Sequence, residues 1–267
     1  MRNMYDVIVV GAGHAGIEAA MAASRMNKNT CLVTLDINMA GSMPCNPSIG
    51  GPAKGIVVRE IDALGGLMPQ VADRTALQFK MLNTTKGPGV WSLRVQSDKE
   101  EYKKEMKKIL LHTPNLTVVE KAVHSLLVKN HKAEGIRCTD GTELYSKTVV
   151  LTTGTYMTSK VLRGHSAISS GPEDQITIDT LSESLRKEGI RTFRLKTGTP
   201  ARILTDSIDF SKTEVQPGTD EFLRFSQSTK KEDVLPFSKQ SVCHLIYTQP
   251  ETHRIINENL KQSAMYS

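Results

Sequence analysis

The sequence predicts an α/β fold built on a parallel sheet, and three neighbouring segments near the N-terminus carry that prediction. Residues 5–10 form a short apolar run, rich in β-branched residues, that stops at Gly11, as a buried parallel strand does. Residues 14–26 are rich in alanine and place apolar side chains at helical spacing. Residues 30–34 form a second apolar run after an Asn-Lys-Asn turn. Together these segments make a βαβ unit of about 30 residues, the usual length of such units.

The rest of the chain continues this pattern and then departs from it. Residues 41–55 form a long loop rich in glycine and proline, which we expect to be ordered and functional. The expected helices are residues 56–64, 98–112 and 180–188, and a buried strand is expected at 147–151. Four short runs with polar turns predict a small β-rich excursion at residues 116–119, 125–129, 135–138 and 143–145. The stretch after residue 201 is polar and irregular, so we expect it to begin a second unit.

The composition is that of an ordinary soluble protein. The chain has 267 residues, enough for one large or two modest domains, with 39% hydrophobic and 23% charged residues. Only 5% are aromatic, so stacking of bases on an aromatic platform is not an obvious strategy. The sequence lacks the roughly 20 uninterrupted apolar residues of a membrane span, and its N-terminus does not resemble a secretory signal. We therefore expect a cytoplasmic protein with no membrane span.

The net charge and the cysteine spacing indicate which partners and which kinds of site to expect. The net charge is +6 and the pI about 9.1, which suits a polyanion such as RNA without requiring one. The densest basic stretch, residues 103–108, is interleaved with glutamates and is expected to be a solvated helix face. The cysteines lie too far apart for a CxxC pair, so we expect neither a metal site nor a disulfide framework. They are Cys31, Cys45, Cys138 and Cys243.

The turn between the first strand and the first helix has the GxGxxG sequence of a dinucleotide-binding loop. Gly11 permits the tight turn, Gly13 lets the backbone approach a pyrophosphate, and Gly16 lets the helix pack closely on the strand. The positive end of the helix then faces the phosphates. The alternative is a tight strand–helix turn without a ligand. The cofactor contacts expected in this turn are Gly11, Ala12, Gly13, His14, Ala15 and Gly16.

Two further segments bear on the cofactor. A dinucleotide-binding fold usually has an acidic residue at the end of its second strand, where the carboxylate grips a ribose. Asp36 lies two residues beyond that end, so it is either this residue or a simple turn residue. Residues 148–155 resemble the strand and Thr-Gly segment of flavoproteins with two dinucleotide-binding units. Thr153 and Gly154 would then pass close to the nucleotide, and the two widely separated signals favour FAD over a lone NAD.

The loop that follows the βαβ unit carries a single cysteine in the string CNPSIGG, which begins at Cys45. Disulfide reductases with a similar front end have two cysteines in this region, so a dithiol mechanism is disfavoured here. A single cysteine near a flavin could be a nucleophile or a proton donor, and a structural thiol is the alternative. The surrounding glycines and prolines favour a functional role.

Several strings together resemble one family. Residues 41–66 contain PCNPSIGG, then Lys-Gly, then DALGG. GAGHAGIEAA begins at Gly11, Leu-Asn is followed by Lys-Gly-Pro at residues 82–88, and KTGTP occupies residues 196–200. The chain is similar over its whole length to the glucose-inhibited division protein A family, the FAD-binding subunit of a tRNA uridine 5-carboxymethylaminomethyl modification enzyme. A generic flavoprotein would share only the first of these motifs.

The resemblance implies a fold and a set of contacts. The fold would be a glutathione-reductase-like FAD-binding Rossmann domain at residues 1–200, and residues 201–267 would begin an inserted NADH- or substrate-side domain. Besides the residues above, the FAD contacts that it implies are Asn46, Gly50, Gly51 and Val123. It also implies a homodimer in the full-length form and a heterotetramer with a tRNA-modification GTPase.

The resemblance also implies a reaction. With the GTPase, FAD, NADH as reductant and methylene-tetrahydrofolate as carbon donor, the family adds an aminomethyl or carboxymethylaminomethyl group at C5 of the wobble uridine (U34) of tRNA. That base lies in a single-stranded loop, where presenting it to an enzyme costs little unstacking. C5 of uracil becomes nucleophilic once a group adds at C6, and the Cys45 thiolate fits that role, with an acid role as the alternative.

The chain also differs from the family. Family members are much longer, with a second functional cysteine and the main tRNA- and GTPase-docking region beyond the point that corresponds to Ser267, so we expect the isolated chain to be inactive. The other readings are a folate- and FAD-dependent tRNA uridine methyltransferase, against which the Cys45 loop argues, and a non-catalytic nucleotide-binding fragment.

Overall fold

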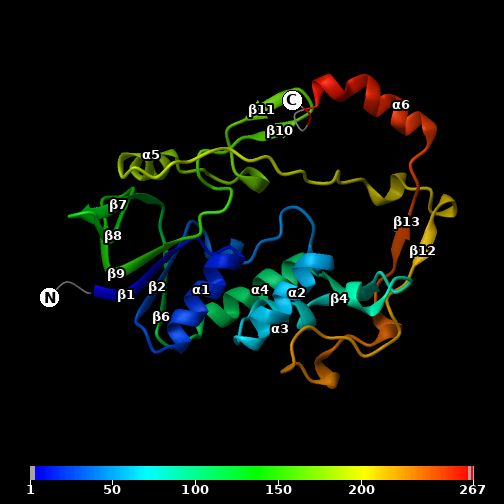
Figure 1. Ribbon diagram of the computed structural model, residues 1–267, viewed down its shortest axis with the longest axis horizontal. Coiled ribbons are helices and arrows are strands. Elements are labelled where there is room, and N and C mark those ends of the chain that lie inside the picture. The colour runs from blue at the N-terminus through cyan, green and yellow to red at the C-terminus, as the bar shows by residue number, and fades with distance from the viewer. Residues whose placement is uncertain (1–3, 264–265, 267) are drawn as a thin grey trace.

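A six-stranded sheet forms the centre of the molecule. The strands are β1 (Met4–Val10), β2 (Thr30–Thr34), β6 (Leu116–Glu120), β7 (Val123–Lys129), β8 (Lys132–Cys138) and β9 (Glu143–Leu151). Their order is β6-β2-β1-β9-β8-β7 (Figure 1); the first four are parallel, and β8 pairs antiparallel with both β9 and β7. The computed structural model describes residues 4–263 and 266, so residues 1–3, 264–265 and 267 of the two predicted domains lie outside it. The predicted α/β fold with a parallel sheet is confirmed.

The central strand β1 separates two apolar cores because its side chains alternate between the faces of the sheet. Val9 belongs to one core, with Leu32 of the neighbouring strand. Ile8 and Val10 belong to the other, which also contains Leu181. A strand buried on both faces reads as a continuous apolar run, as the end of this one does.

Helices cover both faces of this sheet. On one face lie α1 (His14–Arg25) and α4 (Lys99–Leu111), and on the other lies α5 (Asp179–Lys187), which packs against β7. Helix α4 buries Tyr102, Met106 and Leu110, four residues apart on one stripe, and begins where the Asp98 carboxylate accepts hydrogen bonds from two backbone N–H groups. On its outer side, Lys104 pairs with Glu101 at 2.7 Å, in agreement with the predicted solvated face.

A second, three-stranded sheet was not predicted. Its strands are β3 (Ser48–Gly50), β4 (Ala76–Leu82) and β5 (Ser92–Ser97) in the antiparallel order β3-β5-β4, and helices α2 (Pro52–Ala63) and α3 (Met68–Arg74) accompany it. The predicted irregular loop therefore ends early, with β3, and α2 begins before residue 56. Gly51 caps α2 and Pro52 opens it, since proline at a first helical position gives up no hydrogen bond.

The β-rich excursion has the predicted strands, with one difference. The runs predicted at 143–145 and 147–151 form one continuous strand, β9. Ser146, which separates them in the sequence, is buried, and its hydroxyl donates to the carbonyl of Thr148 at 2.9 Å. A polar residue that satisfies its own hydrogen bond does not break the strand.

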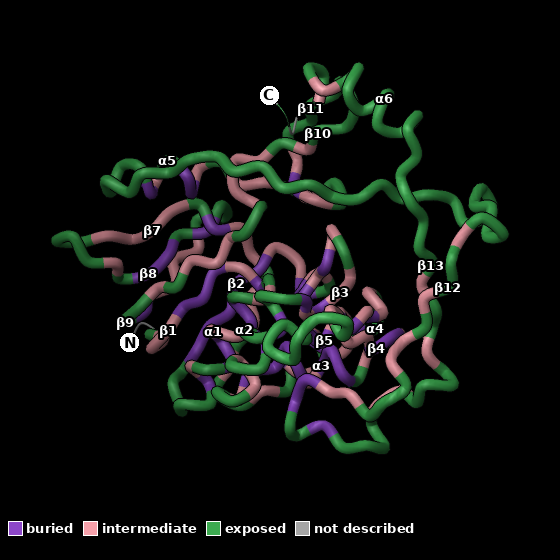
Figure 2. Tube along the Cα trace, turned by 45° about the vertical axis from the view of Figure 1, so that its right-hand side comes forward, coloured by how far each residue is buried: buried purple, intermediate pink, exposed green. Residues whose placement is uncertain are grey.

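The chain after α5 is mostly irregular. Residues 190–204, hereafter the strap, have no regular secondary structure and run across the molecule (Figure 1, yellow). The remaining strands and helix are β10 (Val161–Arg163), β11 (Ser166–Ile168), β12 (Glu214–Gln216), β13 (Cys243–Leu245) and α6 (Pro250–Asn259). The 3-10 turns are Ile37–Met39, Pro88–Val90, Pro172–Asp174, Thr205–Ser207, Phe210–Lys212, Lys231–Asp233, Phe237–Lys239 and Leu260–Gln262. Figure 2 shows the strap and α6 as largely exposed.

The segment that follows the strap is fastened to the second sheet and α3 by buried polar groups. The Asp73 carboxylate accepts hydrogen bonds from the backbone N–H groups of Phe225 and Ser226 and from the Thr229 hydroxyl, at 2.8–2.9 Å. The Gln78 amide donates to two backbone carbonyls of the same segment. The division into domains at residue 200 stays a prediction. Within the described residues, no helix is long and apolar enough to cross a membrane.

Candidate functional site

The glycines of the turn between β1 and α1 serve two purposes. Gly11 has a φ of +104°, and a Cβ added to it would lie 2.5 Å from the carbonyl oxygen of Thr152. A Cβ at Gly16 would lie 1.8 Å from the carbonyl oxygen of Gly11. Gly11 is therefore required by the tight turn and its close approach to Thr152, and Gly16 by the close packing of the helix on the end of the strand.

Gly13 differs from both. A Cβ added there would meet no described atom within 4 Å. Gly13 is the N-cap of α1, and no described side chain caps the helix or places a carboxylate in its first turn. The N–H groups at this helix end are suited to an anion because the helix dipole adds to their attraction. The open space at Gly13 is where a phosphate could approach the backbone.

The Thr-Thr-Gly segment lies directly beside this turn. Strand β9 pairs with β1 up to Val10, and the N–H of Thr152 donates to the Val10 carbonyl at 2.9 Å. The Thr152 hydroxyl donates to the same carbonyl at 2.8 Å. Gly154 has a φ of +53° and open space at its Cβ position. The structure thus brings Thr153 and Gly154 together with the glycine turn, although they are distant in the sequence.

His14 is enclosed at the start of α1. Its Nε2 atom is buried and has no hydrogen-bond partner among the described residues, and its ring lies 5.7 Å from the Tyr102 ring. Burial, together with the nearby positive charge of Lys54, lowers the pKa of His14 to about 4. The imidazole is therefore neutral at physiological pH, and its buried Nε2 atom is left without a hydrogen-bond partner in the described part of the chain. Ala12 is buried and accepts a hydrogen bond from the Gly41 N–H, whereas Ala15 is exposed.

Lys54 lies on the first turn of α2 and brings a positive charge to the same region. Its ammonium donates to the Ser48 carbonyl at 3.2 Å. Although the residue as a whole is exposed, burial around its ammonium lowers the pKa of Lys54. A partly desolvated cation near a helix N-terminus adds to the attraction for an anion.

Cys45 is held between its own loop and the strap. Its thiol donates to the Gly198 carbonyl at 3.2 Å, and the Arg202 guanidinium donates to the Cys45 carbonyl at 3.0 Å. Cys45 is half-buried, whereas Cys31 is completely buried in β2 and burial raises the pKa of its thiol to about 12. The thiol of Cys45 is therefore the more accessible of these two.

The other predicted contacts of the Cys45 loop fall into two groups. A Cβ at Gly50 would lie 2.2 Å from the Leu93 carbonyl, so this glycine is required by the pairing of β3 with β5. Gly51 has open space at its Cβ position and a φ of +102°. The Asn46 side chain is exposed. The Val123 side chain packs in the core of the main sheet, so only its backbone could face a ligand.

Asp36 begins a 3-10 turn after β2. Its carboxylate accepts hydrogen bonds from the N–H and the amide group of Asn38, each at 2.8 Å. This geometry is that of a turn residue, the alternative stated for it above. Glu120, at the end of β6, accepts a hydrogen bond from the Ile37 N–H at 3.2 Å. Glu120 was not considered in the sequence analysis as an acidic residue of the nucleotide site. Its position at the end of a strand that neighbours β2 could have indicated it.

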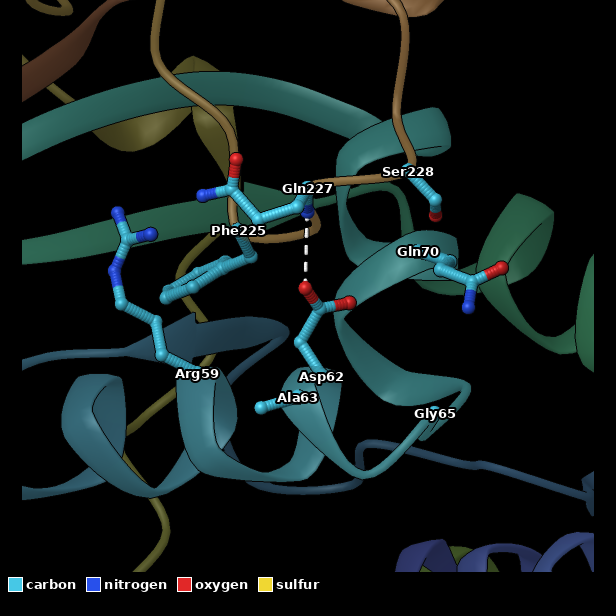
Figure 3. Close-up of a pocket in the computed structure, with 8 residues that line it drawn as sticks. All are labelled: Arg59, Asp62, Ala63, Gly65, Gln70, Phe225, Gln227 and Ser228. Atoms are coloured by element: carbon cyan, nitrogen blue, oxygen red, sulfur yellow. Dashed lines mark hydrogen bonds between the residues drawn. The ribbon is translucent and has the colours of Figure 1, made fainter.

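A cavity of about 410 Å³ lies away from these residues. It is lined by Arg59, Asp62, Ala63, Gly65, Gln70, Phe225, Gln227 and Ser228, and none of them belongs to the predicted site (Figure 3). One wall is the end of α2, where the Asp62 carboxylate accepts the Gln227 N–H at 2.9 Å. The cavity follows from the docking of the segment after the strap. Among the described residues, no cluster of three or more His, Cys, Asp or Glu side chains could hold a metal ion.

Comparison with known proteins identifies relatives over the whole chain. The profile of the family described as Glucose inhibited division protein A matches residues 6–267. A Mycoplasma mycoides protein named tRNA uridine 5-carboxymethylaminomethyl modification enzyme MnmG is 52% identical over 268 residues, covering 100% of this chain and 42% of that protein. A Bacillus thuringiensis protein of the same name is 51% identical, covering 98% and 41%. The chain therefore spans about two fifths of the length of these relatives.

Solved structures support the same family relationship. GidA of Aquifex aeolicus superposes with a TM-score of 0.94 at 44% identity, over 99% of this chain and 45% of that one. The GidA-related protein of Thermus thermophilus gives 0.53 at 19% identity, over 70% of this chain and 69% of that one, which indicates a shared fold alone. The resemblance drawn from the motifs is thus confirmed, and the chain belongs to the glucose-inhibited division protein A family.

Proposed function

We propose that this chain is the FAD-carrying part of an enzyme that modifies the wobble uridine of tRNA. The observation that carries the proposal is the open space at Gly13, at an uncapped helix N-terminus beside Gly154. The names of the relatives, which are tRNA uridine 5-carboxymethylaminomethyl modification enzymes, supply the reaction. The whole enzyme's activity belongs to proteins more than twice as long as the part matched here.

The residues around the turn fit a dinucleotide cofactor such as FAD. The backbone of Gly13 and the first turn of α1 would bind the pyrophosphate, since they offer N–H groups and open space. The unpartnered Nε2 of His14 and the ammonium of Lys54 supply polar groups in the same region. Gly51, Thr153 and Gly154 would let the backbone run close to the cofactor. The bound flavin would supply redox chemistry, with NADH as reductant and methylene-tetrahydrofolate as carbon donor.

Cys45 is the proposed catalytic residue. In the proposed reaction its sulfur adds to C6 of the uridine, which makes C5 nucleophilic, or it donates a proton at the same place. Its half-buried position distinguishes it from Cys31 and Cys138, both of which are buried. Four further residues remain proposed FAD contacts, but with weaker structural support, since their side chains are engaged elsewhere, exposed or absent. They are Asp36, Asn46, Gly50 and Val123.

The proposed assembly follows the family. The substrate is tRNA, the partner is the tRNA-modification GTPase, and the full-length form is a homodimer that joins the GTPase in a heterotetramer in the cytoplasm. Residues 201–267 are proposed to begin the inserted NADH- or substrate-side domain.

Flavin content tests the cofactor site. We expect Gly13→Val to lose FAD while keeping the fold, because its Cβ would meet no described atom within 4 Å and its side chain would enter the proposed phosphate space. Gly89→Val is the matched control, since Gly89 also has open space at its Cβ position and lies in a separate turn. Flavin retained by Gly13→Val at the level of the parent chain would contradict the proposal.

A chimera tests the reaction. The chain would be joined to the remaining sequence of the Mycoplasma mycoides relative and assayed with tRNA, the GTPase, NADH and methylene-tetrahydrofolate. We expect modified uridine from the chimera and none from its Cys45→Ser variant, with FAD content equal in both. Modification by the Cys45→Ser chimera at the parent's rate would exclude a catalytic role for this thiol.

A further inference from the structure

The strap is not held in place by apolar burial. Its large apolar side chains are exposed, and Phe193 and Leu195 are 82% and 84% exposed. No helix or strand is formed between α5 and the turn at residue 205. Its course along the molecule therefore depends on polar contacts with the α/β body.

Two arginines of the strap make such contacts, and they do so at different places. Arg194 donates to the Thr158 carbonyl at 2.8 Å, next to the β10–β11 region. Arg202 donates to the Cys45 carbonyl at 3.0 Å. Both are hydrogen bonds from an exposed guanidinium to a backbone carbonyl, so the two side chains differ mainly in what they fasten.

At Cys45 the contact is reciprocal. The backbone of Cys45 accepts a hydrogen bond from the strap, and its thiol donates one back to the strap, to the Gly198 carbonyl. The loop that carries Cys45 rises toward the strap in Figure 1, where it is drawn in blue. With the backbone fixed by Arg202, rotation of the side chain is what remains free, and the Gly198 carbonyl selects one orientation.

Arg202 lies near other positive charges. The pKa of the Lys99 ammonium is lowered, first by burial and then by the positive charges of Lys103 and Arg202. The Arg202 guanidinium has the Cys45 carbonyl as a hydrogen-bond acceptor at this place.

We propose that Arg202 is a positioning residue for Cys45: it fixes the Cys45 loop against the strap and so directs the thiol at the Gly198 carbonyl. The chemical role of the thiol rests on the proposed function, whereas its orientation does not. In this arrangement the thiol proton is engaged and the strap covers one side of the sulfur.

The test is the alkylation rate of each cysteine by iodoacetamide, measured by mass spectrometry of peptides from the intact chain without RNA. We expect Arg202→Gln to raise the rate at Cys45 by about three- to tenfold, which is the scale of one net hydrogen bond. Arg202→Lys keeps a cationic donor and should restore most of the parent rate. Cys243, which is half-buried and whose thiol donates to the Gln78 side chain, serves as the internal reference.

Arg194→Gln is the matched control, because it releases the strap at Thr158 and leaves the Cys45 contact in place. An unchanged or slower rate at Cys45 in Arg202→Gln would overturn the proposal. So would an equal increase in Arg194→Gln, which would mean that any loosening of the strap exposes the thiol. If the chimera fails to modify tRNA while the alkylation pattern holds, the proposed function fails and the positioning role stands.

Discussion

The α/β body, residues 4–189, and the C-terminal segment, residues 190–263 and 266, are held together by different forces. The body has two apolar cores, in which residues such as Ile8 and Tyr102 are fully buried. In the C-terminal segment, Phe225 is among the few fully buried apolar side chains, and it lies in the core of the body. The body is stabilised by apolar burial, whereas the segment adds only Phe225 and the partly buried Leu223, Val234 and Leu235 to that core and is otherwise placed by hydrogen bonds.

This difference indicates which residues stabilise the fold and which position the proposed site. Apolar burial is non-directional and tolerates small shifts, whereas a hydrogen bond fixes one atom against another. The proposed cofactor turn lies in the body, and the proposed catalytic thiol lies where the body meets the strap. Substitutions in the two regions should therefore differ in size and in kind.

The largest effect is expected at Gly16, where helix and strand touch. A Cβ there would lie 1.8 Å from a backbone oxygen, and backbone cannot move aside cheaply. Gly16→Ala should lose more than about 4 kcal/mol of unfolding free energy, the range of severe substitutions. Urea unfolding would measure this. Gly13→Ala, three residues away in open space, is the control, and equal losses in the two variants would contradict the distinction between them.

The next effect is expected at Asp73, the buried anchor of the C-terminal segment. Asp73→Ala removes three hydrogen bonds and leaves two buried N–H groups without a partner, which costs about 3 kcal/mol. The cost should fall on the segment, so hydrogen exchange should accelerate at residues 222–235 and little in the main sheet. Asp62→Ala, which removes one bond to Gln227, should give a smaller change. Uniform acceleration over the whole chain would mean that body and segment unfold together.

A pH dependence of similar or smaller size is expected from His14. Burial lowers the pKa of His14 to about 4 from its ordinary value of 6.5, so the unfolded chain takes up a proton first as the pH falls. Its contribution to stability is complete above pH 6.5 and is lost as the pH falls toward 4, by about 3 kcal/mol in all.

Urea unfolding at several pH values would measure the loss. The His14→Gln variant should lose less stability than the parent between pH 6.5 and 4, because the glutamine at position 14 cannot take up a proton. His253→Gln, on the exposed helix α6, is the control and should follow the parent. Identical pH profiles for His14→Gln and the parent would show that His14 is not buried in its neutral form.

Much of the body could be predicted because its signals are local. The apolar run of β1, the alanine-rich α1 and the glycines between them are contiguous, and the spacing alone indicates the strand–helix turn. The start of α2 was missed because Pro52 reads as part of a loop, although proline suits a first helical position. The strands β4 and β5 do alternate apolar and polar residues, at 77–81 and at 92–96, so the second sheet had a local signal that the sequence analysis did not use.

For the candidate site too, the parts with a local sequence signal could be predicted and the long-range contacts could not. The glycine turn and the Thr-Thr-Gly segment each have a recognisable string, and parallel pairing of β1 with β9 brings them together. The contact of Cys45 with Gly198 and Arg202 joins residues more than 150 positions apart. Gly198 belongs to the KTGTP string, but nothing in that string or around Arg202 indicates which residue they contact. Asp73 is likewise a single carboxylate whose partners lie far along the chain. Long-range polar contacts of this kind depend on the whole fold, and they produce no periodic pattern in the sequence from which they could be predicted.

The smallest effect is expected on the strap, where a large apolar residue stabilises nothing within the described chain. Phe193 is exposed, so Phe193→Ala removes little buried area and should change the unfolding free energy by less than about 0.5 kcal/mol. Thermal unfolding followed by circular dichroism would measure this. Phe79, a buried residue of β4 in the second sheet, is the matched residue, because the same substitution there leaves a cavity in the core. A loss at Phe193 as large as that at Phe79 would mean that the strap packs against the body through its side chains, and the division between a core-stabilised body and a hydrogen-bonded segment would then be wrong.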